Sequence, residues 1–174
     1  AIEMLSKSVP VGVTVLVKEH WEGVGNRPSY WTDKVAGFPR VEIADPFADS
    51  IEIISKCLAT ATITGTAGFE AAVMGKPVIS LGSNYRFNFV DHVWFQNDIP
   101  GLRKRLKWIF ENREHLDFSE DGHILQQAFE RSCFKVNGQI LNTKKASQEA
   151  VEVACEDLLG RLKIVDDVIS NSNV

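Results

Sequence analysis

The sequence contains few cysteines and no long apolar run. Its three cysteines, Cys57, Cys133 and Cys155, are widely separated along 174 residues and show no CxxC spacing. This arrangement indicates buried thiols in a reducing cytoplasm rather than a disulfide framework or a zinc site. No apolar stretch approaches the roughly 20 residues that span a bilayer, and the first residues lack the pattern of a signal peptide.

Positive charge is also in short supply. The net charge of −4 and the pI near 5.6 exclude the basic footprint of a nucleic-acid-binding protein. The one basic segment, residues 101–110, is short, and we interpret it as the charged face of a helix. With 44% apolar and 24% charged residues, the composition is that of a globular protein with its own core.

Several motifs of catalysis and phosphate binding are missing. The sequence has no HExxH, no G-x-S-x-G and no metal-binding D-x-D in the loops considered below. Gly75 and Lys76 are not a Walker loop, because six residues separate Gly68 from Gly75 and Pro77 replaces the hydroxyl residue. We therefore predict that Gly75 ends a helix and that Pro77 opens a strand.

Strand and helix patterns alternate along the first half of the chain. The strands are expected at 13–18, 41–44, 59–64 and 77–82, and the helices at about 28–36, 51–59 and 69–74. This alternation predicts an α/β fold with a Rossmann-like doubly wound parallel sheet. The apolar run 13–18 is expected to be buried on both faces. Residues 1–98 would form the core, and 99–174 a helical extension of the same domain.

The strongest candidate site follows the strand at 59–64. Small residues there allow a ligand to approach backbone amides, and the start of the next helix favours an anion. Ligands of open α/β sheets bind at this end of the strands. Glu70, expected on the first turn, could accept hydrogen bonds from a ribose, although complementing the helix dipole explains it equally well. The segment consists of Thr64, Gly65, Thr66, Ala67 and Gly68.

Three further loops contribute candidates. The loop after the first strand offers Lys18, His20 and Arg27 for a phosphate, because it should emerge on the same side of the sheet. Ser50 lies where a helix begins, and capping by Asp49 or Ser50 accounts for this loop without a ligand. Tyr85 follows the fourth strand and is placed at the rim of the same cleft.

Taken together, these segments resemble bacterial capsule polysaccharide biosynthesis proteins. The resemblance rests on KEH-x5-Gly-x-Arg, ADPFADS and TGTAGFEAAVMGKPVISLG-x2-Tyr, and it covers roughly residues 2–95. This group includes transferases that use CMP-Kdo and is distantly similar to other GT-B glycosyltransferases. The resemblance implies a carboxy-terminal, nucleotide-sugar-binding domain, with an amino-terminal domain missing upstream of Ala1.

The resemblance also implies roles for single residues. His20 matches the histidine of a His-Pro motif that contacts the donor phosphate, and Trp21 replaces the proline. Thr64, Gly65 and Thr66 match the phosphate-side turn, and Glu70 the acid on the donor ribose. The implied donor is a nucleotide-sugar, with a CMP-sugar favoured, and no metal or other cofactor is expected. A glycan or lipid-linked acceptor, a cytoplasmic location and peripheral membrane association of the full-length protein follow in the same way.

Three hypotheses of function remain open at this stage. The first is the donor-binding domain of a metal-independent glycosyltransferase in capsule or surface polysaccharide synthesis, inactive when isolated. The second is a sugar-nucleotide epimerase, for which the segment supplies no clear acid/base pair. The third is a non-catalytic binding or assembly module with the same fold, which Trp21 favours.

Overall fold

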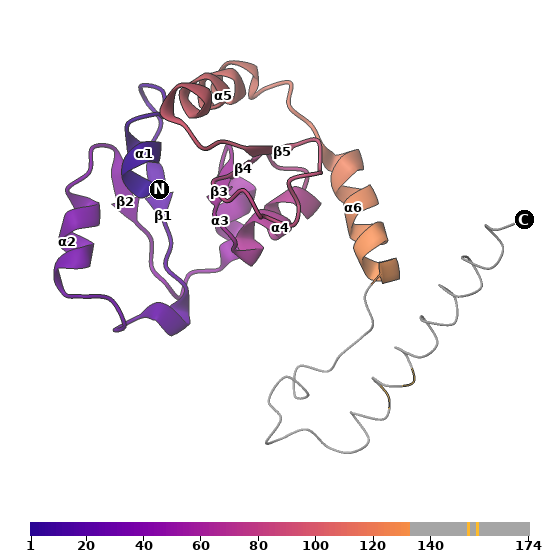
Figure 1. Ribbon diagram of the computed structural model, residues 1–174, viewed down its shortest axis with the longest axis horizontal. Helices are drawn as coiled ribbons and strands as arrows, with labels where there is room; N and C mark the ends of the chain where they lie inside the picture. Colours follow the sequence, from indigo (N-terminus) through magenta and orange to yellow (C-terminus); the bar gives the residue numbers. More distant parts are fainter. Residues whose placement is uncertain (133–152, 154–155, 157–174) are drawn as a thin grey trace, which may run out of the picture. The chain divides into compact units, whose positions relative to one another are not determined.

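The computed structural model describes residues 1–132, 153 and 156 of the chain (Figure 1). Two compact units are distinguished, residues 1–125 and 126–174, and the boundary falls inside helix α6 (Ser119–Ser132). Cys133, Cys155 and much of the predicted helical extension lie outside the described residues. The sheets, the helices before α6 and the candidate site all belong to the first unit.

The strands form two open parallel sheets. β1 (Val15–Val17) pairs with β2 (Val41–Ile43), and β4 (Val78–Ser80) lies between β3 (Thr60–Thr62) and β5 (Val93–Phe95). All three pairings are parallel, which confirms the predicted parallel α/β architecture. Two features differ from the prediction. β5 is an additional strand, and the single predicted sheet is instead two sheets, with the break between β1 and β3.

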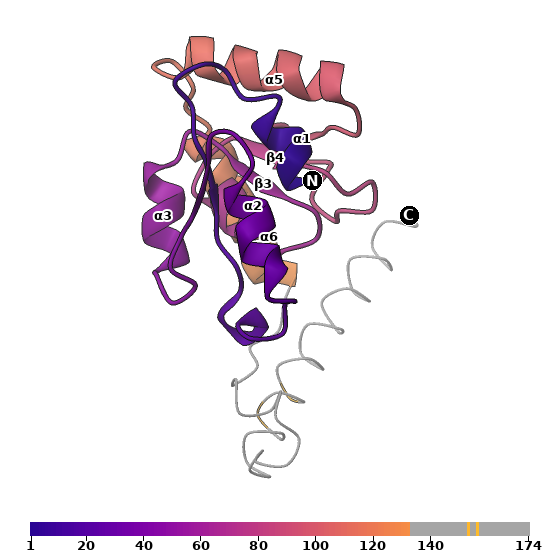
Figure 2. The same cartoon turned by 90° about the vertical axis from the view of Figure 1, so that its left-hand side faces the viewer.

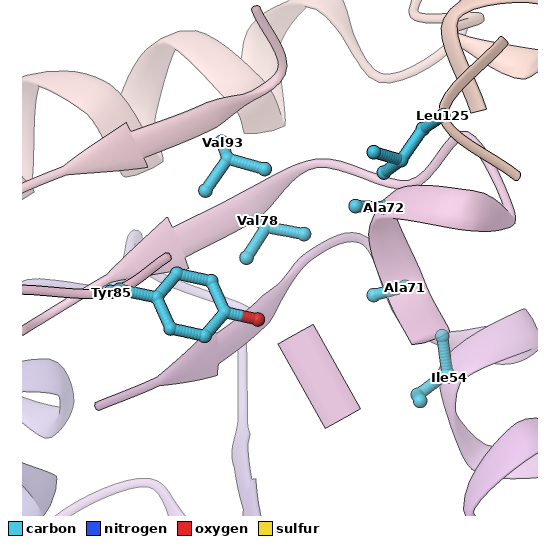
Figure 3. Close-up of a cluster of buried hydrophobic side chains, with 7 residues drawn as sticks. All are labelled: Ile54, Ala71, Ala72, Val78, Tyr85, Val93 and Leu125. Carbon is cyan, nitrogen blue, oxygen red and sulfur yellow. The ribbon is translucent and has the colours of Figure 1, made fainter. Parts of the chain in front are cut away.

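Helices cover both faces of the β3–β4–β5 sheet. Val78 of β4 packs into a cluster with residues of α3 (Ser50–Lys56), α4 (Thr66–Val73) and α6 (Figure 3). The next residue, Ile79, points to the opposite face and packs on Leu102 and Ile109 of α5 (Ile99–Asn112). Successive strand residues alternate between faces, so this pattern gives a layered arrangement with helices on both sides of a parallel sheet.

The first sheet carries shorter helices. α1 (Ile2–Ser6) precedes β1, while the short 3-10 helix η1 (Trp21–Gly23) and α2 (Tyr30–Ala36) connect β1 to β2. The prediction that the run 13–18 is buried on both faces is wrong, because the Leu16 side chain is 42% exposed. Burial of that kind is found instead in β4, which has a strand on each edge and helices on each face.

The carboxyl end of α4 explains the glycine at position 75. Gly75 has φ +67°, its N–H donates to Ala72 O at 3.0 Å, and the N–H of Lys76 donates to Ala71 O at 2.9 Å. This pair of bonds is the Schellman motif, whose left-handed residue is usually glycine. The prediction that Gly75 terminates a helix is confirmed.

His92 ties β5 to the same helix end. The His92 side chain is fully buried, and its Nε2 lies 2.8 Å from Ala72 O. Its ring stacks on Phe118 with centroids 5.0 Å apart, and its Nδ1 lies 4.0 Å from Asp121 Oδ2. The ring therefore adds a second hydrogen bond to a helix carbonyl that already accepts from Gly75 N. His92 is therefore a structural residue rather than a candidate ligand.

Candidate functional site

A cavity of about 660 Å³ lies between β1 and β3. All three residues of each strand contribute to the walls of the cavity. In space, β1 lies between β2 and β3 (Figure 1). The chain passes from β1 to β2 on one side and then returns to β3 on the other side. The cavity therefore lies between two sheets that no backbone ladder joins in this structure, and its walls include residues that precede both strands as well as residues that follow them.

The loops that leave the two strands bring polar groups to this cavity. Lys18 follows β1, while Thr64 and Gly65 follow β3, and all three line the cavity. The sequence prediction had placed these three residues at one site, and the structure brings them together. The Lys18 ammonium donates to Pro46 O at 2.9 Å, which orients it and leaves two of its three N–H donors for a ligand.

The residues after β3 belong to α4 itself. Gly65 is the N-cap of α4, and no capping hydrogen bond from a described side chain is present at this helix start. The N–H of Gly65 donates to Thr62 Oγ1 at 2.9 Å. Thr66, Ala67 and Gly68 form the first turn of the helix, so the prediction of a separate tight turn before a helix at 69–74 is wrong. The prediction that Glu70 lies on the first turn is wrong for the same reason: it is the fifth helical residue.

Tyr85 supports this turn from the inside. Its side chain is 5% exposed, and its hydroxyl donates to Gly65 O at 3.3 Å. A Cβ added at Gly68 would lie 2.5 Å from Tyr85 Oη and 2.5 Å from Thr62 Cγ2, so only glycine fits between them. Burial raises the pKa of the Tyr85 hydroxyl, and the nearby Glu70 carboxylate acts in the same direction. Tyr85 thus lies behind the turn, not at the rim where the sequence had placed it.

His20 and Arg27 are engaged elsewhere in their loop. His20 Nδ1 accepts from Glu22 N at 3.2 Å, which caps η1, and the imidazole is largely exposed. Arg27 pairs with Glu19 at 2.6 Å, and its guanidinium lies 5.2 Å from the centre of the Trp31 ring. Among the described residues that line the cavity, neither of these two side chains appears.

The loop after β2 shows helix capping. Asp49 Oδ1 accepts from Ile51 N at 2.7 Å and from Glu52 N at 3.2 Å, so Asp49 is the N-cap and Ser50 is the first residue of α3. Of the two residues proposed for this role, the structure selects Asp49. Ser50 is not among the described residues that line the cavity. Capping therefore accounts for Asp49 without a ligand.

Several residues of the cavity wall had no recognisable signal in the sequence. The side chains of Leu58 and Ile63 are 41% and 52% exposed, and both line the cavity together with Lys56 and Cys57. Cys57 is a half-buried free thiol whose pKa is raised by burial, an effect that Lys76 partly opposes. These residues line a cavity because the strands form two separate sheets. The hydrophobic periodicity of a sequence does not predict where a sheet is divided.

Replacing Tyr85 with phenylalanine tests the support of the turn. Tyr85→Phe removes one half-buried hydrogen bond and keeps the ring, so we expect the free energy of unfolding to fall by about 1 kcal/mol. Urea unfolding measures this change, with Tyr30→Phe as the matched control because the Tyr30 side chain is 65% exposed. Equal stability of the two variants would show that the hydroxyl does not hold Gly65.

Two kinds of feature are absent from the described residues. No helix among them combines the length and the apolar character needed to cross a membrane. Within the same part of the chain, no three His, Cys, Asp or Glu side chains converge in a way that could hold a metal ion.

Comparison with known proteins gives one distant similarity. Protein FixF from Sinorhizobium fredii (strain NBRC 101917 / NGR234) is 28% identical over 144 residues, which is 77% of this chain and 33% of FixF. The chain therefore spans about a third of the length of this relative. No family model matches the sequence, and no solved structure matches it.

Proposed function

We propose that this chain is the donor-binding domain of a glycosyltransferase with GT-B architecture, acting in capsule or surface polysaccharide synthesis. The observation that carries the proposal is the cavity between β1 and β3, which Lys18, Thr64 and Gly65 line together. A volume of about 660 Å³ lies within the usual range of small-ligand sites. The resemblance to capsule biosynthesis proteins in residues 2–95 supplies the substrate class, a nucleotide-sugar.

Each proposed contact uses a group of this chain. The Lys18 ammonium would bind a phosphate of the donor, together with the backbone N–H groups of Thr66 and Ala67 at the start of α4. The apolar walls, which include Leu16 and Leu58, would receive the less polar part of the ligand. Glu70 would accept from the ribose hydroxyls if the donor extends along α4.

The proposed chemistry is electrostatic. During transfer, an acceptor oxygen forms a bond to the sugar's anomeric carbon, the bond between that carbon and the phosphate oxygen breaks, and the phosphate leaves with the electron pair. Lys18 and the amino end of α4 would stabilise the charge that develops on this oxygen. The acceptor and the group that removes its proton would be supplied by a different domain of the full-length protein. The isolated chain should therefore bind nucleotide without transferring sugar.

A second candidate is a nucleotide-binding module that performs no transfer. The position of His20 favours it, because this side chain caps η1 and is not among the described residues lining the cavity. Full-length protein separates the two candidates. Sugar transfer by the full-length protein that is lost in Lys18→Gln would support the enzyme, whereas nucleotide binding with no transfer by the unaltered full-length protein would support the module.

Calorimetric titration with CMP, UDP, GDP and ADP tests nucleotide binding directly. We expect saturable binding of one of these nucleotides, weakened about 10- to 100-fold in Lys18→Gln because a charge-assisted phosphate contact is lost. Lys34→Gln is the matched control: it removes the same charge from α2, away from the cavity. Absence of binding to any nucleotide, or equal loss in both variants, would refute the site.

A further inference from the structure

The outer face of α5 carries a concentration of positive charge. Its inner face buries Leu102 and Ile109, while Arg103, Lys104 and Lys107 are exposed. Positions three and four apart are neighbours on a helix, so these three side chains lie on one surface. The whole chain has a net charge of −4, which makes this surface a local exception. Figure 2 shows α5 along one margin of the first unit.

Little of this charge is neutralised by carboxylates. Lys107 pairs with Glu111 at 3.6 Å, and Arg103 donates to the backbone oxygen of Lys7 at 3.1 Å. Lys104 forms no ion pair with any carboxylate in the part of the chain that the structure describes. The surface therefore keeps positive charge available for an external partner.

An indole and a hollow accompany the charges. Trp108 lies one turn after Lys104 and is 39% exposed, and Arg105 stacks on Trp94 and Trp108 at 4.4 and 5.4 Å from the ring centres. A hollow of about 230 Å³ is lined by Gln96, Gly101, Lys104, Arg105 and Trp108. Stacking fixes the plane of the Arg105 guanidinium, so its N–H donors are held in place beside the Lys104 ammonium. Two cations beside a small hollow suit a phosphate-bearing headgroup.

We propose that this face of α5 docks onto a bilayer containing anionic phospholipids, with a headgroup phosphate between Lys104 and Arg105. Basic clusters on amphipathic helices are attracted to anionic leaflets, and a tryptophan beside them occupies the polar–apolar interface. A nucleic acid fits less well, because sites that track a strand align several aromatic side chains along a basic groove, whereas the described lining of this hollow has a single aromatic residue, Trp108. The proposal does not depend on the nucleotide site, which is lined by different residues.

Vesicle flotation with the 174-residue chain tests the proposal. We expect the protein to float with vesicles of phosphatidylglycerol and phosphatidylcholine, to ignore phosphatidylcholine alone, and to release as salt is raised. Lys104→Gln/Lys107→Gln should weaken binding about 30-fold, since each basic residue near the surface contributes to attraction. The control, Lys34→Gln/Lys56→Gln, makes the same charge change on α2 and α3 and should bind as the unaltered protein does.

A second measurement reports directly on contact with lipid. Brominated phosphatidylglycerol should quench the fluorescence of the unaltered protein more strongly than that of Trp108→Phe. Binding that is absent, equal for both lipid mixtures, or equally weakened in the two lysine pairs would overturn the proposal. So would tighter binding to a single-stranded oligonucleotide that is lost in Lys104→Gln/Lys107→Gln. Circular dichroism of each variant confirms that it is folded.

Discussion

Alanine at position 75 is expected to lower the free energy of unfolding by about 3 kcal/mol. Two effects combine in Gly75→Ala. The backbone at φ +67° places a Cβ in the left-handed region, and that Cβ would lie 2.6 Å from Ser119 N and 2.7 Å from the carbonyl carbon of Phe118. These are backbone atoms, so the clash is not relieved by rotating a side chain. Urea unfolding of purified protein measures the loss.

Gly12→Ala separates the two effects. Gly12 has φ +84°, and no described atom lies within 4 Å of a Cβ built there, so this variant suffers strain without a clash. We expect a loss of about 1 kcal/mol for Gly12→Ala, which leaves about 2 kcal/mol of the Gly75→Ala effect for the backbone clash. Equal losses in the two variants would contradict the close approach between the end of α4 and residues 118–119.

Alanine at position 68 is expected to affect both stability and binding. The added methyl group would meet Thr62 Cγ2 and Tyr85 Oη at 2.5 Å each, at the buried position of the first turn of α4. Overpacking of this kind costs about 2 kcal/mol. Relief of the clash would move the first turn of α4, so we also expect any nucleotide affinity to fall about tenfold or more, because a phosphate contact depends on the positions of its N–H donors. Urea unfolding and calorimetry measure the two losses.

A compensating variant tests the cause of this loss. Thr62→Ser/Tyr85→Phe removes both contacting atoms and keeps the Thr62 hydroxyl position that accepts from Gly65 N. Gly68→Ala should lower the free energy of unfolding less in the Thr62→Ser/Tyr85→Phe variant than in the unaltered protein. The difference between the two losses is the coupling energy between these neighbouring sites. Additive losses would show that the damage does not come from these two contacts.

Sequence reasoning succeeded where a signal is local. The helix end at Gly75 and the cap at Asp49 could be predicted, because in each case one residue type at one position carries the signal. The start of α4 was placed three residues late, because Gly65 supplies no side-chain cap and glycines suggested a turn. β5 was missed because of its length: Val93–Phe95 consists of strand-favouring residues, but three residues between polar neighbours are too few to show a periodic pattern.

Contacts between segments that are distant along the chain could not be predicted from the sequence. The role of Tyr85 depends on its meeting Gly65 across 20 positions, and the clash at Gly75 depends on residues 118–119. The exposure of β1 was mispredicted because an apolar run indicates potential burial, while actual burial depends on which elements cover the strand. The candidate site shows the same limit: Lys18, Thr64 and Gly65 were expected together, but the cavity between their strands was not.

The division of the sheet has a consequence for how the chain folds. Every strand pairing in the described structure joins strands that follow one another along the chain, β1 with β2, β3 with β4 and β4 with β5. Each pairing therefore closes only the loop between neighbouring strands, which keeps the entropic cost of loop closure low. Since no backbone ladder links β1 to β3 in this structure, each strand group can form before the other is in place. The cavity then lies at the boundary between these two strand groups.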